Sequence, residues 1–168
     1  MLQRFEESTL GADAERTVKA CLTVPDRPDL VARAAALAMR SLRHKPNDAG
    51  TVYCAALADY HVGRYELALY RLRLGRAALK STPFGDWPGH PVMSYAVEAM
   101  ASARLGHGAE ARAALKQAET TLTTGLAAVR GTEGYLDFWH DWVHCEFLVR
   151  EAQAVVADLG FPADPFAH

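Results

Sequence analysis

The stretch FWHDWVHCEF, residues 138–147, gathers the side chains of this chain that are best suited to chemistry. It holds His140 and His144, whose imidazoles would share one face of a helix and could bind a single metal ion. Asp137 extends the same polar strip, but about 10.5 Å of helix rise separates it from His144, too far for all three to share an ion. The glutamate of an H-E-x-x-H motif is absent. A small helical metal- or ligand-binding protein using His140 and His144 is therefore the alternative prediction.

Nucleophilic catalysis is not favoured by these residues. Cys145 follows His144 directly, and neighbouring residues of a helix point about 100° apart, so they cannot form a nucleophile and base pair. The three cysteines are far apart and form no C-x-x-C pair, which argues against a disulfide framework or a cysteine zinc site. No G-x-S-x-G motif occurs. We predict a protein that is not an enzyme and has no cofactor.

Length and composition narrow the class of protein further. A chain of 168 residues fits one domain, and 50% hydrophobic with 23% charged residues is ordinary for a globular protein. The net charge of −2 gives no electrostatic reason to expect nucleic acid or an anionic membrane as partner. The N-terminus lacks the apolar core of a signal peptide, and no run approaches 18 apolar residues. We therefore predict a cytoplasmic protein.

Apolar residues recur at helical spacing along almost the whole chain, and prolines and glycines interrupt them. Gly63 and Gly106 are expected to form tight corners between paired helices. The helix that follows Gly106 has two expected ends: Gly125, or one turn further, within LAAVR. The predicted helices cover about 12–22, 30–44, 49–62, 65–80, 92–105, 109–124 and 135–159.

Paired helices at near-regular spacing indicate repeats. Ala34, Ala68 and Ala111 occupy equivalent places in successive pairs, and alanine allows helices to approach closely without a cost in helix propensity. The long irregular segment STPFGDWPGH, residues 81–90, accounts for the wider second interval. The pattern predicts a single domain over 1–168, with hairpin repeats at about 12–46, 49–80 and 92–124 and a capping helix at about 135–159.

Two of these units resemble tetratricopeptide repeats (TPR): TVYCAALADYHVGRYELALYRLRLGRAAL and SYAVEAMASARLGHGAEARAALKQAETTL. They share the small residues Ala56 and Ala99 in the first helix, the corner glycines and the alanine of the second helix. Asp59 departs from the pattern, because an aromatic residue is common at its position. The resemblance implies an all-α fold, a right-handed stack of antiparallel helical hairpins (a TPR-like α-solenoid) with about seven helices and a C-terminal capping helix.

Nearly the whole chain is also similar to the C-terminal helical-repeat region of large bacterial serine/threonine protein kinases. This narrower resemblance rests on AERTVKACLTVPD, on the two units above and on the closing W-H-D-W stretch. It implies a non-catalytic protein–protein interaction or scaffold region, either part of a kinase or a free-standing relative. Kinase activity itself is not carried over, because V-A-I-K, H-R-D and D-F-G are absent.

In TPR arrays the first helix of each hairpin lines a concave surface, so the resemblance implies a protein or peptide partner bound there. The alternative is a shallow surface whose side chains pack among their neighbours. The identity of the partner and self-association both stay open. The residues expected to face inward are Arg16, Lys19, Tyr53, Leu57, Tyr60, His61, Met93, Met100 and Arg104.

The last predicted helix has two apolar sides. Phe138, Cys145 and Leu148 belong to one side, and a second side is formed by Trp139, Trp142, Val143 and Phe147. A helix that closes a repeat array must bury its apolar surface, so we predict that its tryptophans form the cap. The second side is expected to pack against Phe84 and Trp87 or against a partner. A basic face formed by Arg73, Arg76 and Lys80 is expected to be solvated.

Overall fold

The computed structural model describes residues 11–23, 27–79, 89–132 and 138–160. Within these ranges every regular element is helical and no strand is present, which confirms the all-α prediction and its seven α-helices. A short 3-10 helix, η1 (Asp158–Gly160), extends the last of them. The helices are α2 (Gly11–Leu22), α3 (Pro28–His44), α4 (Ala49–His61), α5 (Tyr65–Leu79), α6 (Gly89–Arg104), α7 (Gly108–Val129) and α9 (Trp139–Ala157).

The corners of two helix pairs are left-handed glycines, as predicted. Gly63 has a φ of 81° between α4 and α5, and Gly106 has a φ of 77° between α6 and α7. At both corners the amide after the glycine donates back across the turn: Arg64 to the Asp59 carbonyl at 2.8 Å, and His107 to the Ser102 carbonyl at 2.9 Å. These bonds satisfy carbonyls at the helix ends that have no partner inside the helix.

Asp59 is a buried charge at the end of α4. Its side chain is fully buried, and its two carboxylate oxygens lie 2.6 Å from Arg64 and 2.6 Å from Arg71. A buried carboxylate needs such partners, because its desolvation is costly otherwise. Through Arg71, this carboxylate holds α4 against α5.

The end of α7 distinguishes between the two expected ends of this helix. The helix runs through Gly125 and ends at Val129, within LAAVR. Gly125 is buried, and tertiary packing outweighs its helix-propensity cost of roughly 1 kcal/mol. The left-handed glycine that follows α7 is Gly131, with a φ of 84°. The predicted start of the last helix, at 135, lies outside the described residues.

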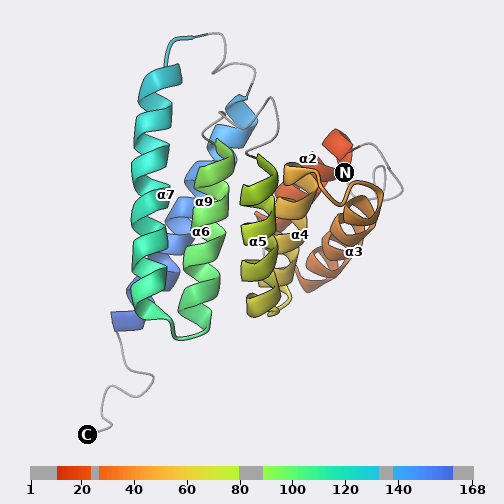
Figure 1. The fold of residues 1–168 in the computed structure, drawn as a ribbon, viewed down its shortest axis with the longest axis horizontal. Coiled ribbons are helices and arrows are strands. Elements are labelled where there is room, and N and C mark those ends of the chain that lie inside the picture. Colours follow the sequence, from red (N-terminus) through yellow and green to blue (C-terminus); the bar gives the residue numbers. More distant parts are fainter. Residues whose placement is uncertain (1–10, 24–26, 80–88, 133–137, 161–168) are drawn as a thin grey trace, which may run out of the picture.

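The helices lie side by side from α3 at one edge to α7 at the other, and α9 lies behind α6 and α7 (Figure 1). Each helix from α2 to α7 contacts the next one along the chain. Ala34, Ala68 and Ala111 are fully buried, as expected for residues at close helix contacts. The core is continuous through all seven helices.

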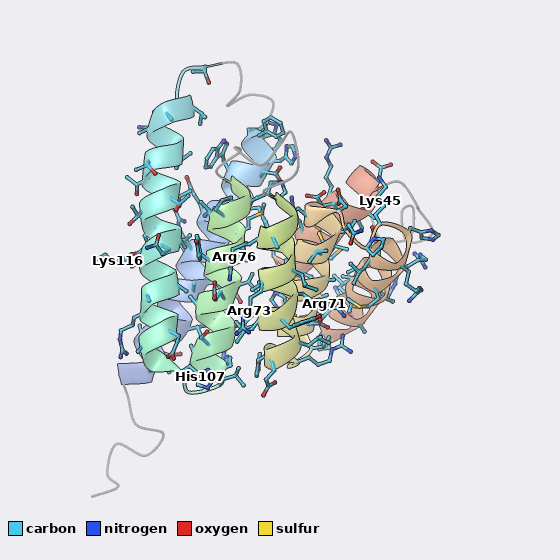
Figure 2. All side chains as sticks on the ribbon, viewed as in Figure 1. Lys45, Arg71, Arg73, Arg76, His107 and Lys116 are labelled. Atoms are coloured by element: carbon cyan, nitrogen blue, oxygen red, sulfur yellow. The ribbon has the colours of Figure 1, made fainter. Side chains whose placement is uncertain are left out.

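The predicted basic face on α5 is only partly solvated. Arg73 is exposed, but Arg76 reaches α6, where it pairs with Glu98 at 2.6 Å and lies 5.3 Å from the centre of the Tyr95 ring (Figure 2). Arg76 thus holds α5 against α6, and Lys80 lies outside the described residues. None of the described helices is both long enough and apolar enough to cross a lipid bilayer.

Replacing Gly106 by Ala tests the corner. A Cβ at this glycine would meet no atom within 4 Å, so the cost comes only from the left-handed backbone and should be about 1 kcal/mol in the free energy of unfolding. Urea denaturation followed by circular dichroism measures it. Gly108→Ala is the matched control, because Gly108 is helical and its Cβ would meet only the Arg112 side chain, at 3.4 Å; it should not destabilise. Equal stability of the two variants would contradict the account.

Candidate functional site

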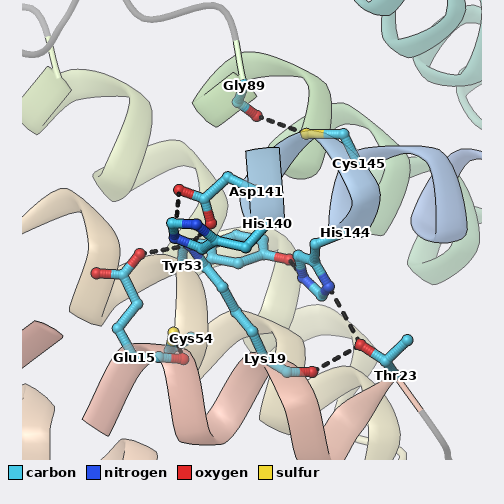
Figure 3. Close-up of polar contacts among 10 residues, drawn as sticks. All are labelled: Glu15, Lys19, Thr23, Tyr53, Cys54, Gly89, His140, Asp141, His144 and Cys145. Atoms are coloured by element: carbon cyan, nitrogen blue, oxygen red, sulfur yellow. Dashed lines mark hydrogen bonds and ion pairs between the residues drawn. The ribbon is translucent and has the colours of Figure 1, made fainter. Parts of the chain in front are cut away.

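Lys19 is the central charge of the interior between α2 and α9. Its residue surface is only 5% exposed, and its Nζ lies 2.5 Å from Glu15 and 2.9 Å from Asp141 (Figure 3). Burial by itself would lower the pKa of Lys19, but the carboxylates of Glu15 and Asp141 outweigh it and raise the pKa above its usual value. The ammonium therefore stays charged and ties α9 to α2.

His144 forms a second link beside this cluster. Its Nε2 lies 2.9 Å from the Tyr53 hydroxyl and its Nδ1 lies 3.2 Å from the Thr23 hydroxyl (Figure 3). The Thr23 hydroxyl also donates to the Lys19 carbonyl at 2.7 Å, so it accepts from His144 Nδ1–H. Nε2 then accepts from Tyr53, which fixes the tautomer of a neutral imidazole and connects α2, α4 and α9.

The protonation states of these groups agree with this series of hydrogen bonds. Burial, helped by the charge of Lys19, lowers the pKa of His144 to about 3. Burial also raises the pKa of Tyr53 well above its usual value, so its hydroxyl keeps the proton that it donates. The arrangement is uncharged except for the pairs of Lys19, and every polar group in it has a partner.

The cysteines do not provide a reactive thiol. All three are buried, and burial raises the pKa of each. The Cys145 thiol donates to the Gly89 carbonyl at 3.5 Å, which anchors α9 to the start of α6 (Figure 3). A thiol kept protonated in the interior is a poor nucleophile.

His140 and His144, the two expected metal ligands, make different contacts. Both ring nitrogens of His144 are occupied by hydroxyl groups, whereas His140 Nε2 lies 3.7 Å from Asp141. Among the residues that the structure describes, no group of three His, Cys, Asp or Glu side chains is arranged to hold a metal ion. Asp137, the third member of the predicted strip, lies outside them.

Most of the residues expected on a concave surface belong to the packed interior. They do come from α2, α4 and α6, the first helices of the pairs, but α9 lies against α6 and reaches Lys19 and Tyr53. The buried ones offer a partner almost no accessible surface. Arg16 and Arg104 are exposed and His61 is half-buried, with its pKa lowered by burial to about 4. The buried ones are Lys19, Tyr53, Leu57, Tyr60, Met93 and Met100.

The tryptophans of α9 divide in a way that differs from the prediction. Trp142 is buried at 1% exposure, so it belongs to the core, whereas Trp139 is 57% exposed. Val143 and Phe147 are 42% and 52% exposed, so most of the second apolar side is open to solvent rather than covered. Phe84 and Trp87, its expected covers, lie outside the described residues.

The exposed side of α9 forms one wall of a groove of about 680 Å³, and α2 forms the other. A smaller hollow of about 350 Å³ adjoins it and shares Thr23, His144 and Phe147. We call the two together the α2/α9 groove. Sequence reasoning missed it, although the spacing of Trp139, Val143 and Phe147, one turn apart, was a signal for a continuous ridge. The larger part is lined by Arg16, Lys19, Ala20, Thr23, Trp139, His140, Asp141, Val143, His144 and Phe147.

Comparisons of this chain with models of protein families, with curated proteins and with solved structures give no match.

Asp141→Asn should lower the free energy of unfolding by about 3 kcal/mol, because it removes a carboxylate from the buried ammonium of Lys19. Adding Lys19→Met and Glu15→Gln should restore most of the loss, since the buried ammonium and its other carboxylate are then both gone. Denaturant titration of the single and triple variants measures both. Asp29→Asn, at an exposed ion pair with Arg27, is the control and should leave stability unchanged. A neutral Asp141→Asn variant would contradict the role given to Lys19.

The depressed pKa of His144 predicts a dependence of stability on pH. The unfolded state binds a proton near pH 6.5, whereas the folded state binds it only near pH 3, so acidification below 6.5 favours unfolding. Each such histidine contributes about 1.4 kcal/mol per pH unit between these values. The asparagine of the His144→Asn variant cannot titrate. From pH 6.5 to 4, the free energy of unfolding of this variant should therefore fall less steeply than that of the wild type, by about 1.4 kcal/mol per pH unit. Parallel curves for the two proteins would contradict the neutral state of His144.

Proposed function

We propose that this chain is a non-catalytic protein-binding module of the TPR type. In this proposal α2/α3, α4/α5 and α6/α7 form a right-handed stack of antiparallel hairpins, and α9 closes it. The support is that each of these helices contacts the next, that two corners are left-handed glycines, and that the contact alanines are buried. Such modules act by offering a surface, so the function depends on which surface is open.

The observation that carries the proposal is the exposed ridge of Trp139, Val143 and Phe147 in the α2/α9 groove. Large apolar side chains that stay in water on one continuous surface are typical of interaction sites. Behind the ridge, the buried polar groups of Lys19 and His144 are already paired within the chain. The apolar side chains of the ridge lie outside this interior and are not part of the buried core. A protein partner that covers the ridge would gain the burial that the chain itself does not provide.

The non-catalytic part of the proposal is supported by the chemistry of the groove. Its two buried basic groups are paired: Lys19 with two carboxylates, and His144 with two hydroxyls. A general base needs a free acceptor and a pKa near the working pH, and His144 has neither.

The kinase connection is a separate extension of the proposal. It holds that the module is the regulatory C-terminal part of a bacterial serine/threonine kinase, or a free-standing relative, and acts in the cytoplasm. Its support is the sequence similarity alone. The reading frame upstream of Met1 tests it, because a kinase origin requires the V-A-I-K, H-R-D and D-F-G motifs in that frame.

Affinity capture with a matched pair of variants tests the proposed function. The wild-type chain should retain a specific protein from an extract of the cells that make it, identified by mass spectrometry. Val143→Glu with Phe147→Glu should abolish that retention, because two charges would be buried at the interface. Tyr70→Glu with Leu74→Glu places the same charges on the exposed surface of α5 and should retain the protein. Circular dichroism checks the fold of each. Capture that survives the groove variant, or no specific capture at all, would contradict the proposal.

A further inference from the structure

We propose that the α2/α9 groove binds an amphipathic helix that lays apolar side chains, one turn apart, on the ridge of α9 and presents a carboxylate to Arg16. This inference rests on the proposed function and names the kind of partner for the same site.

The shape of the groove fits a helix. Trp139, Val143 and Phe147 follow one another at i, i+4 and i+8, so their ridge runs about 12 Å along α9. Opposite them, Ala20 of α2 adds almost no bulk, which leaves space between the two helices. The adjoining hollow continues the groove as far as Glu151, which makes it about 18 Å long, or more than three helical turns.

The exposed outer side of the ridge favours a helix over a small molecule as the occupant of the groove. A small molecule seated in the larger hollow would cover only the sides of Trp139 and Phe147 that line the hollow, and it would leave their outer sides in water. A helix lying along the groove covers the ridge from above and buries both sides. Helix-in-groove recognition uses the same spacing of anchors that α9 displays.

The charges of the groove specify the polar residue of the partner. Arg16 lines the groove, is exposed, and makes no ion pair with any described residue. Lys19 is also cationic, but it is buried and already paired with Glu15 and Asp141. These two carboxylates are thus occupied by Lys19. At the far end Arg150 lies 3.7 Å from Glu146 of its own helix. Arg16 is therefore the Arg or Lys side chain of the groove that has no carboxylate partner among the described residues, and a carboxylate is its natural complement.

Selection from a displayed library of helical peptides tests the inference without knowledge of the natural partner. The peptides are about 15 residues long, enough to span the groove as a helix, with all outward positions randomised. On the wild-type chain the enriched sequences should combine apolar residues one turn apart with Asp or Glu. On Arg16→Glu the enriched charge should change to Lys or Arg. A synthetic peptide from the first selection should bind Arg16→Glu about tenfold more weakly, measured by fluorescence anisotropy.

The controls separate this inference from the proposed function. Selected peptides should lose binding to the Val143→Glu, Phe147→Glu variant and keep it with the Tyr70→Glu, Leu74→Glu variant. Peptides that bind the wild type and both double variants alike would overturn the inference, and so would peptides that bind Arg16→Glu as well as wild type. Capture of a native protein through the groove would still support the proposed function in either case. Failure to enrich any helical peptide would also overturn it.

A second copy of the chain is the competing occupant. Sedimentation velocity of the purified protein should show a monomer that keeps its sedimentation coefficient in the Val143→Glu, Phe147→Glu variant. A dimer that these substitutions dissociate would mean that the ridge is covered by its own counterpart, and would overturn the inference.

Discussion

The buried ammonium of Lys19 is the constraint on which the arrangement of the C-terminal helix depends. A lysine with 5% exposure must have its ammonium paired or lose its charge, and one partner is a carboxylate of its own helix, Glu15. The second carboxylate comes from Asp141, 122 residues later in the chain. Since Asp141 belongs to α9, this ion pair requires α9 to reach Lys19 of α2 while it packs against α6 and α7.

That position also decides which side of α9 is left in water. Asp141, His144 and Cys145 each find a partner on a different helix: Lys19 on α2, Tyr53 on α4 and Gly89 on α6. Three directional contacts within two turns fix the rotation of α9 about its axis. The residues on the opposite side, Trp139, Val143 and Phe147, then have no place in the core. The exposed ridge is thus a consequence of satisfying the polar interior, and the groove beside α2 follows from it.

The sequence predicted the local structure well and the interior poorly, for one physical reason. Helix periodicity, the left-handed corners at Gly63 and Gly106 and the small contact residues depend on near neighbours, so they could be recognised from the chain alone. Which tryptophan is buried depends on how α9 packs against helices that are distant in the chain, so Trp139 and Trp142 could not be distinguished. One signal of a buried lysine was present in the sequence. Lys19 lies one helical turn from Glu15, a possible ion-pair partner, and next to the apolar Val18 and Leu22.

Native-state hydrogen exchange, resolved by residue, tests most directly whether α9 is held in this way. If the contacts of Lys19 and His144 make α9 part of the cooperative core, the amides from Trp142 to Ala152 should exchange only through global unfolding, with the same free energy as those of α4. Exchange of the α9 amides through a separate opening of much lower free energy, while α4 stays protected, would show that α9 is not held by these contacts and would contradict the account.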